Sequence, residues 1–123
     1  MVKPATVFSA SASVTTSATC AASLTHDGQT FWYCSGLTIT YGGATAASLQ
    51  KATLTGLKGG PITLALAVPG SVTSGGALNL DFPSALAGVD QNTDVTLSLP
   101  AMGAGNAFAC ASVRGYRGAR QLA

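Results

Sequence analysis

Residues 95–99 read Val-Thr-Leu-Ser-Leu, with an apolar side chain at every second position and Ser or Thr between. The same alternation recurs at 37–41, at 62–68 and at 78–82. A period of two is typical of a half-buried strand, which turns one face to the core and the other to solvent. The many Thr and Val residues favour the same state. The chain is therefore predicted to be built from strands.

Glycine- and proline-rich stretches separate these runs and divide the chain into about eight short antiparallel strands. The Asp-Gly pair at 27–28 suits a tight hairpin between its two flanking strands. At most two short helical turns are expected, one within 44–51 and one within 84–89, and neither segment is long enough for a stable helix. Short strands with such turns predict an all-β fold, a single β-sandwich or a jelly roll. The expected strands are 5–13, 17–25, 30–41, 48–55, 61–68, 77–83, 93–99 and 106–116.

The apolar positions of these strands predict the core, and the 123 residues suffice for one domain spanning 1–123. A loose arm over 1–5 and a tail over 117–123 are expected at its ends. The residues expected to be buried are Leu37, Ile39, Ile62, Leu64, Leu66, Leu78, Leu80, Phe82, Val95, Leu97 and Leu99.

Charge is scarce, since only 8% of the residues are charged and none is Glu. Average globular chains carry about 25% charged residues, and charge keeps small free domains apart. The composition therefore indicates a subunit that sits in an assembly, whose first expected partner is another copy of itself. A net charge of +2 is too small to predict nucleic-acid binding.

The sequence carries no feature that places the protein in or across a membrane. No apolar run reaches the ~18 residues that a membrane helix needs. The N-terminus has one positive charge and no apolar segment behind it, so no secretory signal is expected. Synthesis in the cytoplasm is the corresponding expectation.

Catalytic signatures are missing, and no catalytic residue is assigned. The only histidine, His26, falls in a predicted turn, where histidines are usually solvated. Asp81 and Asp94 could face each other across adjacent strands as an acid–base pair. Asp at a strand end more often caps a turn. An enzyme is therefore not expected.

No cofactor or metal ion is expected either. Asp90, Asn92 and Asp94 place oxygen atoms at alternate positions, as at the start of a calcium loop. However, no glycine follows at the turn and no Glu closes the loop. The alternative is a polar turn in which Asn and Asp bond their own backbone.

One aromatic cluster, Phe31, Trp32 and Tyr33, lies on a predicted strand. There Phe31 and Tyr33 would face one way and Trp32 the other. One face must belong to the core. The other is open to a neighbouring subunit or to a carbohydrate, because Trp and Tyr anchor interfaces and also stack on sugars.

The C-terminal stretch 114–120 reads Arg-Gly-Tyr-Arg-Gly-Ala-Arg and supplies further interface candidates. Such a composition binds single-stranded nucleic acid weakly. A solvated end, or pairing with carboxylates of a neighbouring subunit, fits the sequence better. The candidate interface residues here are Arg114, Tyr116, Arg117 and Arg120.

The three cysteines, Cys20, Cys34 and Cys110, match no zinc-binding spacing. Three reduced thiols inside the producing cell are the first expectation. Cys20 and Cys34 flank the predicted Asp-Gly hairpin and would face each other only in one register. Because the count is odd, a disulfide between subunits after release is a further alternative.

The segment 77–117 resembles small β-sandwich structural proteins of tailed bacteriophages. The resemblance rests on a Phe-Pro segment at 82–83, an Asn-Thr strand start at 92–93 and a closing Val-Arg-Gly-Tyr strand at 113–116. It implies a virion component, such as a capsid decoration or cement protein or a tail or fibre subunit. The implied partners are virion proteins such as the major capsid protein. The alternative is a carbohydrate-binding module that uses Trp32 and Tyr33.

Overall fold

Eight strands and no helix make up the computed structural model, which describes residues 8–106 and 108–118. The all-β prediction is confirmed. Each predicted strand is present, with ends shifted by a few residues. The strands are β1 (Phe8–Val14), β2 (Cys20–Leu24), β3 (Phe31–Gly42), β4 (Ser48–Thr55), β5 (Ile62–Val68), β6 (Gly75–Ala87), β7 (Val95–Leu99) and β8 (Ala109–Gly118).

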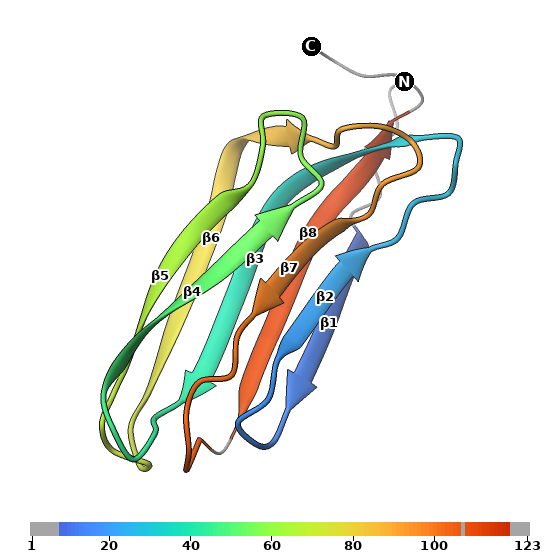
Figure 1. The fold of residues 1–123 in the computed structure, drawn as a ribbon. Helices are drawn as coiled ribbons and strands as arrows, with labels where there is room; N and C mark the ends of the chain where they lie inside the picture. Colours follow the sequence, from blue (N-terminus) through green and yellow to red (C-terminus); the bar gives the residue numbers. More distant parts are fainter. Residues whose placement is uncertain (1–7, 107, 119–123) are drawn as a thin grey trace.

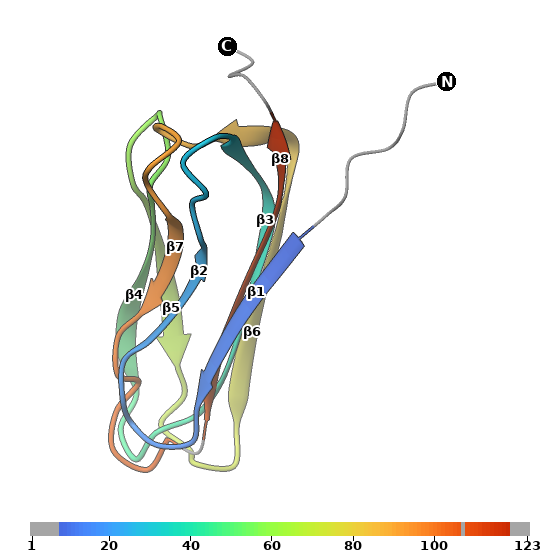
Figure 2. The ribbon, with the colours of Figure 1, turned by 90° about the vertical axis from the view of Figure 1, so that its right-hand side faces the viewer.

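The strands form two four-stranded antiparallel sheets packed face to face (Figures 1 and 2). Their orders are β1-β8-β3-β6 in the first sheet and β2-β7-β4-β5 in the second. Strand 1 pairs with 8, 2 with 7, 3 with 6 and 4 with 5. This is the winding of an eight-stranded jelly roll, one of the two architectures that the sequence predicted.

The winding corrects one local prediction. Strands β2 and β3 belong to different sheets, so the Asp-Gly pair at 27–28 lies in an arch between sheets and not in a hairpin. Turn chemistry fixes a change of direction but not the sheet that the chain enters next. The limit of two short helical turns holds: neither forms, because residues 48–51 belong to β4 and 84–87 to β6.

The expected arm at 1–5 lies outside the described residues. The expected tail begins too early, because Arg117 and Gly118 pair with β3 as the last residues of β8.

The core lies between the sheets and follows the predicted alternation, with one systematic exception. Leu37, Ile39, Leu66, Val95, Leu97 and Leu99 are buried. The remaining predicted core residues are only partly buried and all lie on β5 or β6, the edge strands on one side of the sandwich. An edge strand has one neighbour, so its inward side chains keep a solvent-facing flank. These residues are Ile62, Leu64, Leu78, Leu80 and Phe82.

Both ends of the sandwich consist of loops, and they differ in charge. In the view of Figure 1 the upper end carries the β2–β3 arch and the β6–β7 loop, and the end of β8 reaches it too. We call it the polar end. The opposite end, the loop end, holds no charged residue in its described segments 15–19, 43–47, 69–74 and 100–106.

Candidate functional site

The polar end gathers most of the acidic and basic side chains of the described chain, counting Asp, Lys, Arg and His. His26 and Asp27 come from the β2–β3 arch, Asp90 and Asp94 from the β6–β7 loop, and Arg117 from the end of β8. The two loops are also joined by backbone: Gly28 N–H donates to the carbonyl of Gln91 at 3.0 Å. This cluster is therefore the candidate functional site.

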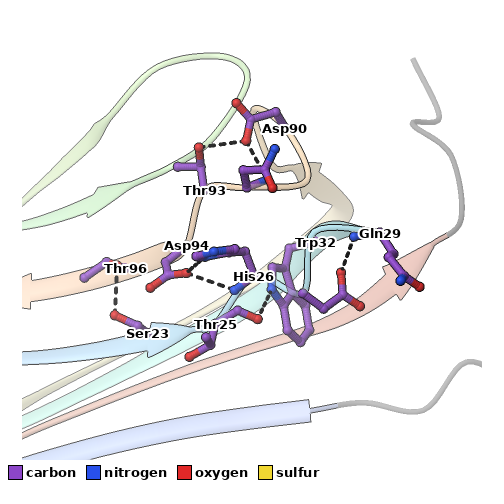
Figure 3. Close-up of polar contacts among 11 residues, drawn as sticks. Ser23, Thr25, His26, Gln29, Trp32, Asp90, Thr93, Asp94 and Thr96 are labelled. Carbon is purple, nitrogen blue, oxygen red and sulfur yellow. Dashed lines mark hydrogen bonds and ion pairs between the residues drawn. The ribbon is translucent and has the colours of Figure 1, made fainter.

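His26 and Asp94 form the tightest contact of the cluster (Figure 3). The backbone N–H of His26 donates to Asp94 Oδ1 at 2.9 Å, and the ring Nδ1 lies 2.6 Å from the same oxygen. Both bonds favour the charged carboxylate, and they lower the pKa of Asp94. Asp94 does not face Asp81, the acid–base pairing that the sequence analysis set aside, because Asp81 lies on β6 in the other sheet and binds Arg114.

A His–Asp pair orients an imidazole, but a catalytic triad also needs a nucleophile on the other ring nitrogen. Among the described residues, no hydrogen bond joins a hydroxyl or thiol to the His26 ring. The nearby hydroxyls of Ser23 and Thr96 bond each other at 2.9 Å (Figure 3). The pair therefore serves to tie the β2–β3 arch to the start of β7.

Asp27 organises the arch from within. Its carboxylate accepts hydrogen bonds from the backbone N–H of Gln29 and of Thr30, and from the Thr30 hydroxyl. Arg117 adds an ion pair at 3.5 Å. The two backbone hydrogen bonds are the main reason that the pKa of Asp27 falls from 3.8 to about 2.

The polar end should therefore weaken in acid. A carboxylate whose pKa is depressed by folding stabilises the native state above its unfolded pKa, and this contribution is lost as pH falls through the folded pKa. For Asp27 the window runs from 3.8 down to about 2. We expect the melting temperature to drop across that window, and Asp27→Asn to drop less steeply than the parent. Parallel curves, measured by circular dichroism, would refute this role.

The alternate oxygens at 90–94 do not converge on a metal position. Asp90 Oδ1 accepts the backbone N–H of Asn92 and the hydroxyl of Thr93, each at 2.8 Å, while Asp94 is held by His26 (Figure 3). These bonds make the polar turn that the sequence offered as the alternative. Across the described ranges, no three His, Cys, Asp or Glu side chains are grouped to hold a metal ion.

Trp32 closes the core at the polar end and is only 4% exposed. Its indole N–H donates to the carbonyl of Thr25 at 3.0 Å, which ties the arch to the core (Figure 3). The ring of Phe8 meets it edge-on at 5.6 Å, and the guanidinium of Arg117 lies over both rings at 4.7 and 4.8 Å. The cluster joins β1, β3, β8 and the arch.

The other aromatic candidates lie around Tyr33, which is 3% exposed. Its ring stacks on Tyr116 of the neighbouring strand at 5.4 Å. Phe31 is half-buried. Since Trp32 and Tyr33 are both buried, neither ring offers a free face on which a sugar could stack. This counts against the carbohydrate alternative.

Arg114 and Arg117 both pair with carboxylates of their own chain. Arg114 crosses the outer face of the first sheet to Asp81 at 2.9 Å and also donates to the hydroxyl of Thr38. The path is open only because residue 36 is glycine: a Cβ there would lie 2.7 Å from the carbonyl oxygen of Leu80 and against the guanidinium. Arg120 lies outside the described residues.

Sequence reasoning missed these ion pairs because their partners lie far apart in the chain. One feature of the sequence did indicate the position of the Arg114 side chain. A glycine inside a strand marks a close approach of another group, and Gly36 interrupts the alternation of β3 where Arg114 crosses it.

The three cysteines are free thiols, and no two of them face each other across a hairpin. Cys20 on β2 and Cys34 on β3 belong to different sheets, so the register considered for a bridge between them does not exist. Burial raises the pKa of both thiols. Cys110 is partly exposed.

Thiol reactivity should follow this burial. An aromatic disulfide reagent at neutral pH is expected to modify Cys110 first, and Cys20 and Cys34 only as the protein unfolds, because buried thiols are inaccessible and poorly ionised. Peptide mapping against time measures the order. Cys110→Ser should remove the fast phase; a fast phase that survives this substitution would contradict the assignment.

Comparisons with known proteins add no relative. No protein-family model, no curated protein and no solved structure matches the chain. The resemblance of 77–117 to phage structural proteins therefore stays a prediction. In the described residues no helix is long and apolar enough to span a membrane.

Proposed function

We propose that the protein is a non-enzymatic structural subunit of a phage virion, of the capsid decoration or cement kind. It acts by burying its surface against neighbouring subunits. Its partners are other copies of itself and virion proteins such as the major capsid protein, and its location is the virion. The observation that carries the proposal is the near absence of charge on both broad faces of the sandwich.

Small neutral side chains run across each face in rows set by the strand register. On the described outer faces the charged groups are Lys51 and the Arg114–Asp81 pair, which neutralises itself. The centres of protein interfaces contain few charged residues. Faces of this kind can therefore be buried by a partner without the cost of removing water from charged groups. The central row of the first sheet is Ser11, Ser112, Thr38 and Asn79; that of the second is Ala21, Ser98, Thr53 and Thr63.

The architecture supports the same class by analogy. Jelly rolls occur in viral capsid proteins and in lectins, so the winding alone admits a structural and a sugar-binding role. The burial of Trp32 and Tyr33 favours the structural role. The hydrogen bonds and ion pairs at the polar end fit a fixed scaffold, since they join loops to each other.

Quantitative mass spectrometry of phage particles purified on density gradients tests this proposal. Particles from cells that carry the gene should contain the chain at a fixed ratio to the major capsid protein. If the chain stayed in the supernatant and did not band with the particles, the proposal would be overturned. A glycan array on the purified chain is the second arm: specific sugar binding would favour the carbohydrate alternative.

A further inference from the structure

One side of the sandwich is open. Strands β5 and β6 are the edges of their sheets and lie on the same side, at the left of Figure 1. Each has a hydrogen-bonded neighbour on one flank only, β4 for β5 and β3 for β6. The other flank of each strand presents unpaired backbone groups, except at the end of β6, where the carbonyl of Ala87 accepts the N–H of Lys58 beside the bridge between Leu57 and Gly88.

The inward side chains along this side form an incompletely covered apolar strip, which we call the seam. It consists of the partly buried Ile62, Leu64, Leu78, Leu80 and Phe82. The edge strand β1, on the opposite side, carries smaller partly buried residues, Ala10, Ala12 and Val14. The larger incompletely buried apolar area is therefore the one along β5 and β6.

A groove of about 620 Å³ continues the seam toward the polar end. Its lining includes the apolar residues Leu57, Pro61, Ile62 and Leu86 and, at the polar end, Lys58. It opens where β6 bulges, because residues 82–85 of β6 lie opposite Ser35 alone between the paired positions Asp81 and Leu86. The open side thus combines two free edges, a seam and a groove.

Most of the length of these edges lacks the usual protection against pairing. Natural edge strands carry Lys, Pro, bulges or inward-pointing charges that deter another strand. No charged residue occurs on β5, and the one on β6, Asp81, is bound to Arg114 on the outer face. Pro83 lies within the bulge, so the segment 75–81 is left without a deterrent.

We propose that a second copy of the chain covers the seam, with its β6 antiparallel to the first β6 across a two-fold axis. The first sheet would then continue through both copies, and the β5 side chains would pack over the joint. This inference rests on the proposed function and names the surface through which the first neighbour binds.

A second copy fits better than a single foreign strand. One added strand could pair with β6 or with β5 and would leave the other edge open, whereas a copy brings cover for both. The seam carries no charge, so the seams of two copies do not repel each other. A two-fold contact also closes on itself and does not propagate into fibres.

The available area is at the small end for a specific interface. Residues 75–81 of β6 make an edge of about 24 Å at ~3.4 Å per residue. With a width of about 20 Å for two sheets ~10 Å apart and their side chains, each copy presents about 500 Å². Two copies together then bury about 1,000 Å², the lower bound for a specific interface.

Single lysines at exposed edge positions test the seam by sedimentation equilibrium. Ala77→Lys on β6 and Ala65→Lys on β5 should weaken a wild-type dimer by at least about tenfold, since edge lysines block strand pairing. Ala21→Lys, at an equally exposed position on β2 across the sandwich, is the matched control and should dimerise like wild type. A monomeric wild type, a dimer broken only by Ala21→Lys, or a ladder of open oligomers would each overturn the proposal.

Hydrogen exchange of the unmodified protein provides a second measurement, independent of any variant. Amides within 75–81 should gain protection as protein concentration rises through the dimerisation range. Unchanged exchange there, with protection gained elsewhere, would also overturn the seam. The two proposals fail separately: a monomer that is still a fixed component of particles refutes the seam alone, and a seam dimer absent from particles refutes the virion role alone.

Discussion

Leu97→Ala is expected to lower the free energy of unfolding by about 2–5 kcal/mol, the range for truncating a buried leucine to alanine. Leu97 is fully buried at the centre of β7. It faces Ala22 on one neighbouring strand and Leu54 on the other, so the lost volume lies in the middle of the second sheet. The surrounding strands are held in place by two ladders of hydrogen bonds, so they can move little to fill such a cavity.

Urea unfolding followed by the fluorescence of Trp32, the single tryptophan, measures the effect. Leu49→Ala is the control, because Leu49 is a leucine on a neighbouring strand that is 75% exposed. It should change the midpoint little. Equal shifts in the two variants would mean that the inward and outward positions of these strands have been assigned wrongly.

The second large effect is expected at Trp32. Trp32→Ala removes a buried ring, its hydrogen bond to the arch and the surface on which Phe8 and Arg117 rest. Replacing a buried Trp or Phe by Ala costs about 3–5 kcal/mol. Thermal unfolding by far-ultraviolet circular dichroism measures it, because the variant has lost the fluorescent residue.

Trp32→Phe separates the contributions. Phenylalanine keeps much of the apolar contact but cannot donate to the carbonyl of Thr25, so an intermediate loss of stability is expected. Hydrogen exchange in the arch, at residues 25–30, should rise in both variants. An Ala variant as stable as the parent would contradict the closure of the core by Trp32.

The strands could be predicted from sequence because alternation is a local property. Residues 95–99 show which side chains share a face, and the structure buries Val95, Leu97 and Leu99 as expected. Alternation does not show which strand lies beside which. For this reason the arch at 27–28 was predicted as a hairpin, and the partly buried positions of β5 and β6 were predicted to be mostly buried.

The polar end could not be predicted, for the same reason. His26 meets Asp94 and Arg114 meets Asp81 only after the chain has wound through both sheets. The arginine-rich stretch was expected to reach solvent or a neighbour. Its described arginines pair within the chain because β8 lies beside β3 in the middle of a sheet, where their side chains reach Asp81 and Asp27.

The pairing of Phe8 with Gly115 places the start of β1 beside the last part of β8, the strand that runs on to the polar end. The chain therefore enters and leaves the sandwich on one side. Two dyes attached to the same molecule, one at the start of β1 and one near Gly115 of β8, would therefore lie close enough for energy transfer between them.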